Sequence, residues 1–138
     1  MKSKGMFRIT IKCLLVILMG LSLARPVSAA DEINYYAYLS EKDRYNSNGD
    51  RLKSVAAILR QDRANYHKGR RDRADEDDGG IFATAAGRAK FESYSIILEA
   101  LDSADLIRGV QKGVMVRVAG RRIYVSGAEF EEGEGGSP

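Results

Sequence analysis

The chain has 138 residues, enough for one domain of modest size, with 22 Lys and Arg residues against 19 Asp and Glu residues. Five of the basic residues and none of the acidic ones lie in residues 1–29, so the remainder carries a net charge of −2. That balance excludes a strongly basic nucleic-acid-binding domain. The only Cys also lies in residues 1–29, which excludes disulfides and thiol chemistry in the remainder.

Residues 1–29 have the layout of a secretory signal peptide. A basic stretch comes first, an apolar run follows at residues 13–23, and small residues close the segment at Ala29. This order predicts cleavage after Ala29 and export to the periplasm or the extracellular space. An uncleaved anchor is the alternative, but the apolar run is shorter than the roughly 20 residues that cross a bilayer. We therefore expect no stable membrane span after cleavage.

Residues 31–39 form a short segment that is rich in tyrosine. Tyr36 and Tyr38 alternate with Ala37, a spacing typical of an extended strand. One interpretation is that these two side chains and Tyr35 stack on a sugar. More often such tyrosines cap a small core and keep their hydroxyls in water, and this structural role is the preferred interpretation.

Residues 46–68 predict a capped amphipathic helix, the clearest folding signal after the export signal. Its apolar stripe recurs with helical spacing and consists of Leu52, Val55, Ala56, Leu59 and Tyr66. The Asn and Ser side chains at residues 46–48 can accept hydrogen bonds from the first N–H groups of a helix. Gly69 is a natural stop at the other end.

Residues 68–80 have no apolar face, and their charges are segregated. The basic residues come before residue 74, and four acidic residues follow at 75–78. This composition predicts a solvated loop that partly neutralises itself. A docking loop and a weak divalent-cation site are the alternatives.

Residues 81–104 predict a second helix, because aromatic and aliphatic side chains recur there with helical spacing. That face consists of Phe91, Tyr94, Ile97, Leu98 and Leu101. Residues 114–125 alternate as strands do, around a tight turn, and predict a β-hairpin. Residues 106–110 are either a third strand or a last helical turn. Residues 127–138 read as a disordered acidic tail rich in Gly and Glu.

Together these elements predict one small α+β domain at residues 30–126. Two helices pack on a small antiparallel sheet that includes the C-terminal β-hairpin. About 109 residues remain after the expected cleavage, which is sufficient for a single core.

No motif in the sequence indicates catalysis. His67 is the only His, and with no Cys after residue 29 neither a zinc site nor another metal site is expected. A G-x-S-x-G nucleophile and a phosphate-binding loop are both absent from the sequence. We therefore predict no cofactor and assign no catalytic residue.

Three functions remain, in order of preference. The first is an exported, non-enzymatic accessory or protein-interaction domain with an unknown protein partner. The second is a weak binder of an anionic envelope polymer or ligand, through a basic face on the first helix and the hairpin. The residues assigned to that face are Arg60, Arg63, Arg70, Arg71, Arg121 and Arg122. The third is a small enzyme that uses only Asp, Glu, Tyr and Arg.

Each function predicts a different structural feature. An interaction domain should expose an apolar patch of more than a few hundred Å². An anion binder should show one continuous basic face. An enzyme should hold buried carboxyl groups with raised pKa values in a cleft.

Overall fold

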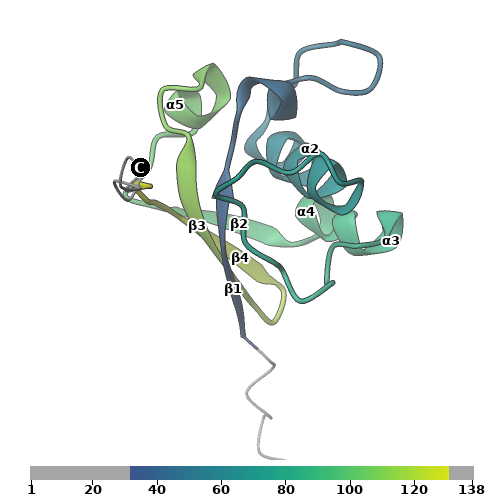
Figure 1. Ribbon diagram of the computed structural model, residues 1–138. Coiled ribbons are helices and arrows are strands. Elements are labelled where there is room, and N and C mark those ends of the chain that lie inside the picture. Colours follow the sequence, from purple (N-terminus) through teal and green to yellow (C-terminus); the bar gives the residue numbers. More distant parts are fainter. Residues whose placement is uncertain (1–31, 131–138) are drawn as a thin grey trace, which may run out of the picture.

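The computed structural model describes residues 32–130 and shows a four-stranded sheet with short and long helices packed on it (Figure 1). The predicted signal peptide and residues 131–138 of the predicted tail lie outside the described residues. In chain order the elements are β1 Ile33–Tyr38, the 3-10 helix η2 Glu41–Arg44, α2 Val55–His67, α3 Ala85–Arg88, α4 Lys90–Ser93, β2 Ser95–Glu99, α5 Ser103–Arg108, β3 Gly113–Ala119 and β4 Arg122–Gly127.

The strands lie in the order β1-β3-β4-β2. The pairs β1–β3 and β3–β4 are antiparallel, and β3–β4 is the predicted C-terminal hairpin. The α+β class and the hairpin are thus confirmed. The sheet is mixed rather than purely antiparallel, because β2 runs parallel to β4. The chain returns from β2 through α5 and β3 before it adds β4 beside β2, and a long connection of this kind permits a parallel pair.

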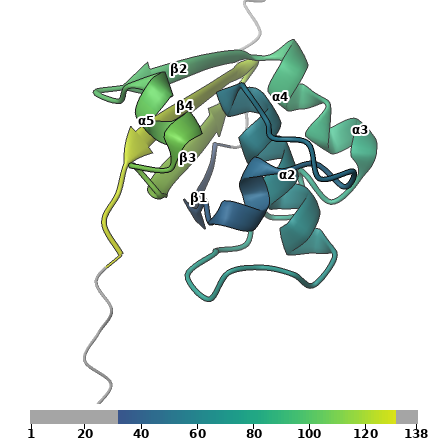
Figure 2. The same cartoon turned by 90° about the horizontal axis from the view of Figure 1, so that it is seen from above.

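The core lies between the sheet and α2. Val116 of β3 and Val125 of β4 are fully buried, as are Ile58 and Leu59 on the facing side of α2. Figure 2 shows α2, α3 and α4 gathered on one side of the sheet. Within residues 32–130, no helix covers the opposite side, where Met115 keeps 37% of its surface exposed. One face of the sheet is therefore open to solvent, an arrangement common for antiparallel strands.

The helix predicted at residues 46–68 begins nine residues later, at Val55. Ser54 is its N-cap, and the Ser54 hydroxyl accepts the backbone N–H of Ala57 at 3.2 Å. Upstream, the Asn46 side chain accepts the N–H groups of Asn48 and Asp50 at 2.9 Å each. Short polar side chains compete for backbone N–H groups in this way, so the residues expected to start the helix form a turn instead.

The single helix predicted at residues 81–104 was wrong, because only residues 85–88 and 90–93 are helical before the strand that begins at Ser95. The chain there forms two single helical turns, α3 and α4, and then the strand β2. Tyr94 and Leu98 pack against the core as predicted, and Ile96 joins them. These three residues have a spacing of two, and pairing with β4 selects the strand over the helix. Of the two alternatives for residues 106–110, the helical turn is confirmed, because α5 ends at Arg108.

Arg44 ties α5 to the end of β1. Its side chain is fully buried and donates to the carbonyl oxygens of Leu39 and Ser40, both at 2.7 Å, and of Leu106 at 3.2 Å. Gly109 ends α5 with a φ of 84°. A Cβ at residue 109 would lie 2.9 Å from Cζ of Arg44, so glycine is required both by the backbone and by this contact.

The first prediction concerns this contact. Gly109→Ala should lower the free energy of unfolding by about 2–3 kcal/mol, because left-handed strain adds to the displacement of Arg44. Gly120→Ala is the matched control, since Gly120 has a φ of 59° and a Cβ at residue 120 would meet no atom within 4 Å. It should lose only about 1 kcal/mol of backbone strain. Equal losses in urea denaturation would show that the Arg44 contact is unimportant.

Candidate functional site

Residues 72–78 run along the free edge of β1. The backbone N–H of Glu76 donates to the carbonyl oxygen of Tyr36 at 2.9 Å, and the N–H of Tyr36 donates to Oε2 of Glu76 at 2.8 Å. The N–H of Tyr38 donates to Oδ1 of Asp75 at 2.8 Å. The segment therefore closes an edge that would otherwise be open to strand pairing. The sequence predicted a solvated loop here, and that prediction was wrong for Asp75 and Asp78, whose side chains are at most 1% exposed.

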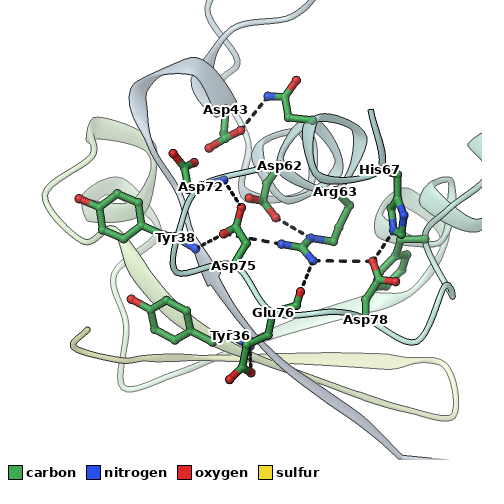
Figure 3. A network of polar contacts seen from close by, with 12 residues as sticks. Tyr36, Tyr38, Asp43, Asp62, Arg63, His67, Asp72, Asp75, Glu76 and Asp78 are labelled. Carbon is green, nitrogen blue, oxygen red and sulfur yellow. Dashed lines mark hydrogen bonds and ion pairs between the residues drawn. The ribbon is translucent and has the colours of Figure 1, made fainter. Parts of the chain in front are cut away.

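An acid cluster, which we define as Asp62, Asp75 and Asp78 around Arg63, holds this segment in place (Figure 3). Nε of Arg63 donates to Oδ2 of Asp62 at 2.7 Å, and Nη1 donates to the carbonyl oxygen of Glu76 at 2.9 Å. The carboxylates of Asp75 and Asp78 each lie 3.8 Å from the guanidinium. Arg63 is fully buried, although the sequence placed it on an exposed basic face.

Two aromatic rings enclose the guanidinium of Arg63. Its Cζ lies 4.5 Å from the ring centroids of both Tyr35 and Tyr66, within the range of a cation–π contact. His67 follows on the same helix, and its Nε2 lies 2.8 Å from Oδ2 of Asp78. The position of Arg63 therefore depends on α2, on β1 and on the segment after α2.

Burial raises the pKa of Asp62 to about 8, although Arg63 opposes the shift, and the nearby charge of Asp75 adds to it. Burial also raises the pKa values of Asp75 and Asp43. Burial and the charge of Asp75 therefore both favour the protonated form of Asp62. The side chains of Asp62, Asp75 and Asp78 are at most 1% exposed, which keeps them away from any ligand in solvent.

A cleft of about 900 Å³ lies next to the segment that closes β1, and residues 72–74 of that segment form part of its wall. It is lined by Tyr36 and Tyr38 of β1 and by residues 72–74, 110–113 and 128–130. Segments distant in sequence thus meet around the alternating tyrosines. The predicted tail contributes to this wall, since Gly127 is the last residue of β4 and the N–H of Ala128 donates to the carbonyl oxygen of Gly113 at 3.0 Å.

Two polar atoms of residues that line the cleft are buried and lack a hydrogen-bond partner within the described residues. The first is Oη of Tyr36, whose side chain is 7% exposed. A Cβ at residue 113 would lie 2.4 Å from this oxygen, so Gly113 is needed to accommodate it. The second is Oδ2 of Asp72, while Oδ1 of the same carboxylate pairs with Nζ of Lys42 at 2.6 Å. Both atoms are closed off from solvent, so a ligand in the cleft does not reach them in this structure.

Aromatic rings form the apolar part of the cleft. The ring of Phe130 lies 6.0 Å from the ring of Tyr36, centroid to centroid, and Phe130 keeps 46% of its surface exposed. In Figure 3 the rings of Tyr36 and Tyr38 extend in the same direction from β1, with Asp72 beside Tyr38. The cleft therefore offers apolar ring surface beside the polar side chains of its lining.

The six arginines predicted to bind anions do not form one set in the structure. Arg63 is buried, and Arg60 pairs with Glu92 of α4 at 2.7 Å. Arg60 and four others keep exposed side chains, and those four lie in two pairs on different elements: Arg70 and Arg71 just after α2, and Arg121 and Arg122 at the turn between β3 and β4.

Of the residues that line the cleft, the sequence analysis singled out only the tyrosines of β1. The alternation of Tyr36 and Tyr38 with Ala37 put both tyrosines on one face of a strand, which the structure confirms. Asp72 and Lys112 gave no separate signal, because nothing in their local sequence indicates that the two residues approach β1. Only the long-range folding of the chain brings these side chains together.

Comparisons with models of protein families, with curated proteins and with solved structures found no match for this chain. Within residues 32–130, no group of three or more His, Cys, Asp and Glu side chains is arranged to hold a metal ion. No helix in that same range has the length and apolar character needed to cross a membrane.

Proposed function

We propose that the protein is an exported, non-enzymatic binding domain and that its ligand or partner occupies the cleft beside β1. The observation that carries this proposal is an open cleft of about 900 Å³ whose lining includes the half-buried ring of Tyr38 and the exposed ring of Phe130. Clefts of several hundred Å³ that combine aromatic and polar side chains are typical of ligand sites. The export part rests on the signal-like residues 1–29.

Binding is favoured over catalysis by where the unusual carboxyl groups lie. The groups with raised pKa values are those of Asp43, Asp62 and Asp75. A general acid or base must come within hydrogen-bond distance of a reacting group. All three side chains are buried and none of them lines the cleft, so the feature that would favour an enzyme is absent from the cleft within the described residues.

The binding of an anionic polymer is the second candidate. It is supported by the exposed pairs Arg70 with Arg71 and Arg121 with Arg122. Arg63 is buried in the core and Arg60 pairs with Glu92, so less positive charge is available to bind an anionic polymer. Exposed charges are also screened over about 8 Å at physiological salt. We therefore rank it below the cleft.

The test is a screen of small soluble ligands by saturation-transfer NMR, followed by the variant Tyr38→Ala. Tyr38 is half-buried and lines the cleft, so removing its ring should weaken ligands found there about tenfold and change stability little. The matched control is Tyr124→Ala. Tyr124 is a half-buried tyrosine on β4 whose ring stacks with Arg117 and which does not line the cleft.

Equal weakening by the Tyr38 and Tyr124 variants would contradict the proposal. Ligand binding that is unchanged by Tyr38→Ala but lost in the double variant Arg121→Glu and Arg122→Glu would favour the anionic polymer instead.

A further inference from the structure

We propose that two copies of the protein pair through their β2 edges, antiparallel and across a two-fold axis, so that their two sheets become one. This inference goes beyond the proposed function, because β2 and β1 are opposite edges of the sheet and the cleft lies beside β1. It follows from the outer backbone groups of β2, from the order of its side chains and from the closed edge of β1.

β2 is an edge strand whose outer backbone groups have no hydrogen-bond partner within residues 32–130. It pairs with β4 only, and Figure 2 shows it along the border of the sheet. The N–H of Ser95 donates to the carbonyl oxygen of Arg121 at 3.1 Å, so Ser95 and every second residue after it face β4. The N–H and C=O groups of Ile96 and Leu98 therefore point away from the sheet.

The middle of β2 lacks the features that usually keep an edge strand from pairing. Its five residues include no Lys, Pro or Gly, and its only charged residue, Glu99, is the last one. Ile97 at its centre keeps 36% of its surface exposed. The other edge of the sheet is protected, because residues 72–78 occupy outer groups of β1. An unprotected edge is a template for an added strand.

The sequence of β2 is complementary to itself when one copy is reversed. With the two-fold axis at Ile97, this residue faces Ile97 of the second copy, Ile96 faces Leu98, and Ser95 faces Glu99. Aliphatic side chains thus meet aliphatic ones, and no like charges are directly opposite. In this register Ile96 and Leu98 form the hydrogen-bonded pairs, which satisfies the outer N–H and C=O groups of both strands.

Charges on the open face of the sheet also match across the axis. Arg122 of β4 is exposed and is the register partner of Ser95. Since Ser95 of one copy faces Glu99 of the other, Glu99 and Arg122 lie on either side of a small side chain. Their Cα atoms are then about 10 Å apart, within the combined reach of the two side chains. Symmetry forms this ion pair twice, and opposite charges placed in this way fix the register.

The closed edge of β1 limits the assembly to two copies. A two-fold contact uses the β2 edge of both copies, and residues 72–78 cover the remaining edge of the four-stranded sheet. The result is a closed dimer and not a growing fibre. One short strand from each copy makes a small interface, so we expect a dissociation constant on the order of 10–100 µM.

The first experiment is oxidative cross-linking of Ile97→Cys in the protein purified after expression of the full sequence. Facing residues of a non-hydrogen-bonded antiparallel pair have Cα atoms about 4.5 Å apart, within the range of a disulfide. Mild oxidation at a protein concentration on the order of 100 µM should convert most of this variant to a covalent dimer.

Met115→Cys is the matched control. Met115 lies on the same open face and is 37% exposed, but it belongs to β3 inside the sheet. Both variants carry Cys13 equally, so any cross-linking through that residue is the same in each. The control should remain largely monomeric under the same oxidation.

Sedimentation equilibrium over a range of concentrations tests the association without a cross-link. The mass of the parent protein should rise with concentration toward that of two chains. Ile97→Lys places like charges opposite each other at the axis and should weaken the dimer at least about tenfold. Met115→Lys should leave it unchanged within about twofold. Circular dichroism should show both variants folded, because both side chains are exposed.

Three results would overturn the inference. A mass of one chain at every concentration, or equal cross-linking of Ile97→Cys and Met115→Cys, would show that β2 does not pair with itself. Equal weakening by Ile97→Lys and Met115→Lys would show that the copies associate through the open face of the sheet instead of its edge. None of these results bears on the cleft, since no residue of β2 lines it.

Discussion

Arg63→Met should destabilise the domain by about 3–5 kcal/mol, a large share of the roughly 5–15 kcal/mol that keeps a domain folded. The variant keeps much of the side-chain volume between the rings of Tyr35 and Tyr66 but removes the charge. The carboxyl groups of Asp62, Asp75 and Asp78 would then be buried without their cation. The segment that closes β1 would also lose the hydrogen bond from Arg63 to the carbonyl oxygen of Glu76.

Arg60→Met is the matched control for this prediction. Arg60 lies one turn earlier on α2, is exposed and pairs with Glu92 in solvent, so its loss should cost no more than about 1 kcal/mol. Urea denaturation followed by circular dichroism measures both variants. A loss for Arg63→Met as small as that for Arg60→Met would mean that the acid cluster does not hold the fold together.

Lowering the pH from 8 to 5 should stabilise the protein. Burial raises the pKa of Asp62 to about 8 in the folded state, against about 4 in the unfolded chain. Between these values the folded protein binds one more proton, so stability falls as pH rises, by up to about 1.4 kcal/mol per pH unit. This contribution is complete below pH 4 and gone above pH 8. The raised pKa values of Asp43 and Asp75 act in the same direction.

Asp62→Asn tests which group causes this dependence. An amide does not titrate, so the variant should show a flatter stability profile between pH 5 and 8 and should gain on the parent protein at pH 8. Asp77→Asn is the control, because Asp77 is exposed and its Oδ1 accepts the N–H of Gly79, which an amide oxygen can also do. Chemical denaturation at several pH values gives the slopes. An unchanged slope in Asp62→Asn would contradict this account.

The sequence predicts α2 and the hairpin well, because burial imposes a regular spacing on their apolar residues. Leu59 and Val116 are buried as their periodicity indicates. The start of α2 was predicted too early, since the Asn46 side chain can satisfy the backbone of a turn as readily as that of a helix. β2 was predicted as helix because five residues are too few to separate a spacing of two from one of 3.6.

The acid cluster could not be predicted from local patterns. Arg63 sits on a helix where a basic residue usually faces water. Its partners Asp75 and Asp78 come from the charged segment after α2, and composition alone predicts a solvated loop there. The segment is ordered because β1 offers it unpaired backbone groups, and that requires the folded sheet. The cleft depends on the same long-range assembly, so only its tyrosines were visible in the sequence.

The most direct test of the binding cleft is a chemical-shift map. The ¹⁵N-labelled protein is titrated with the tightest ligand from the NMR screen, and backbone amide shifts are followed in ¹H–¹⁵N correlation spectra. The cleft predicts that the largest shifts fall in residues 72–74, 110–113 and 128–130, together with Tyr36 and Tyr38. Largest shifts at Arg70, Arg71, Arg121 and Arg122, with the cleft residues unmoved, would contradict it.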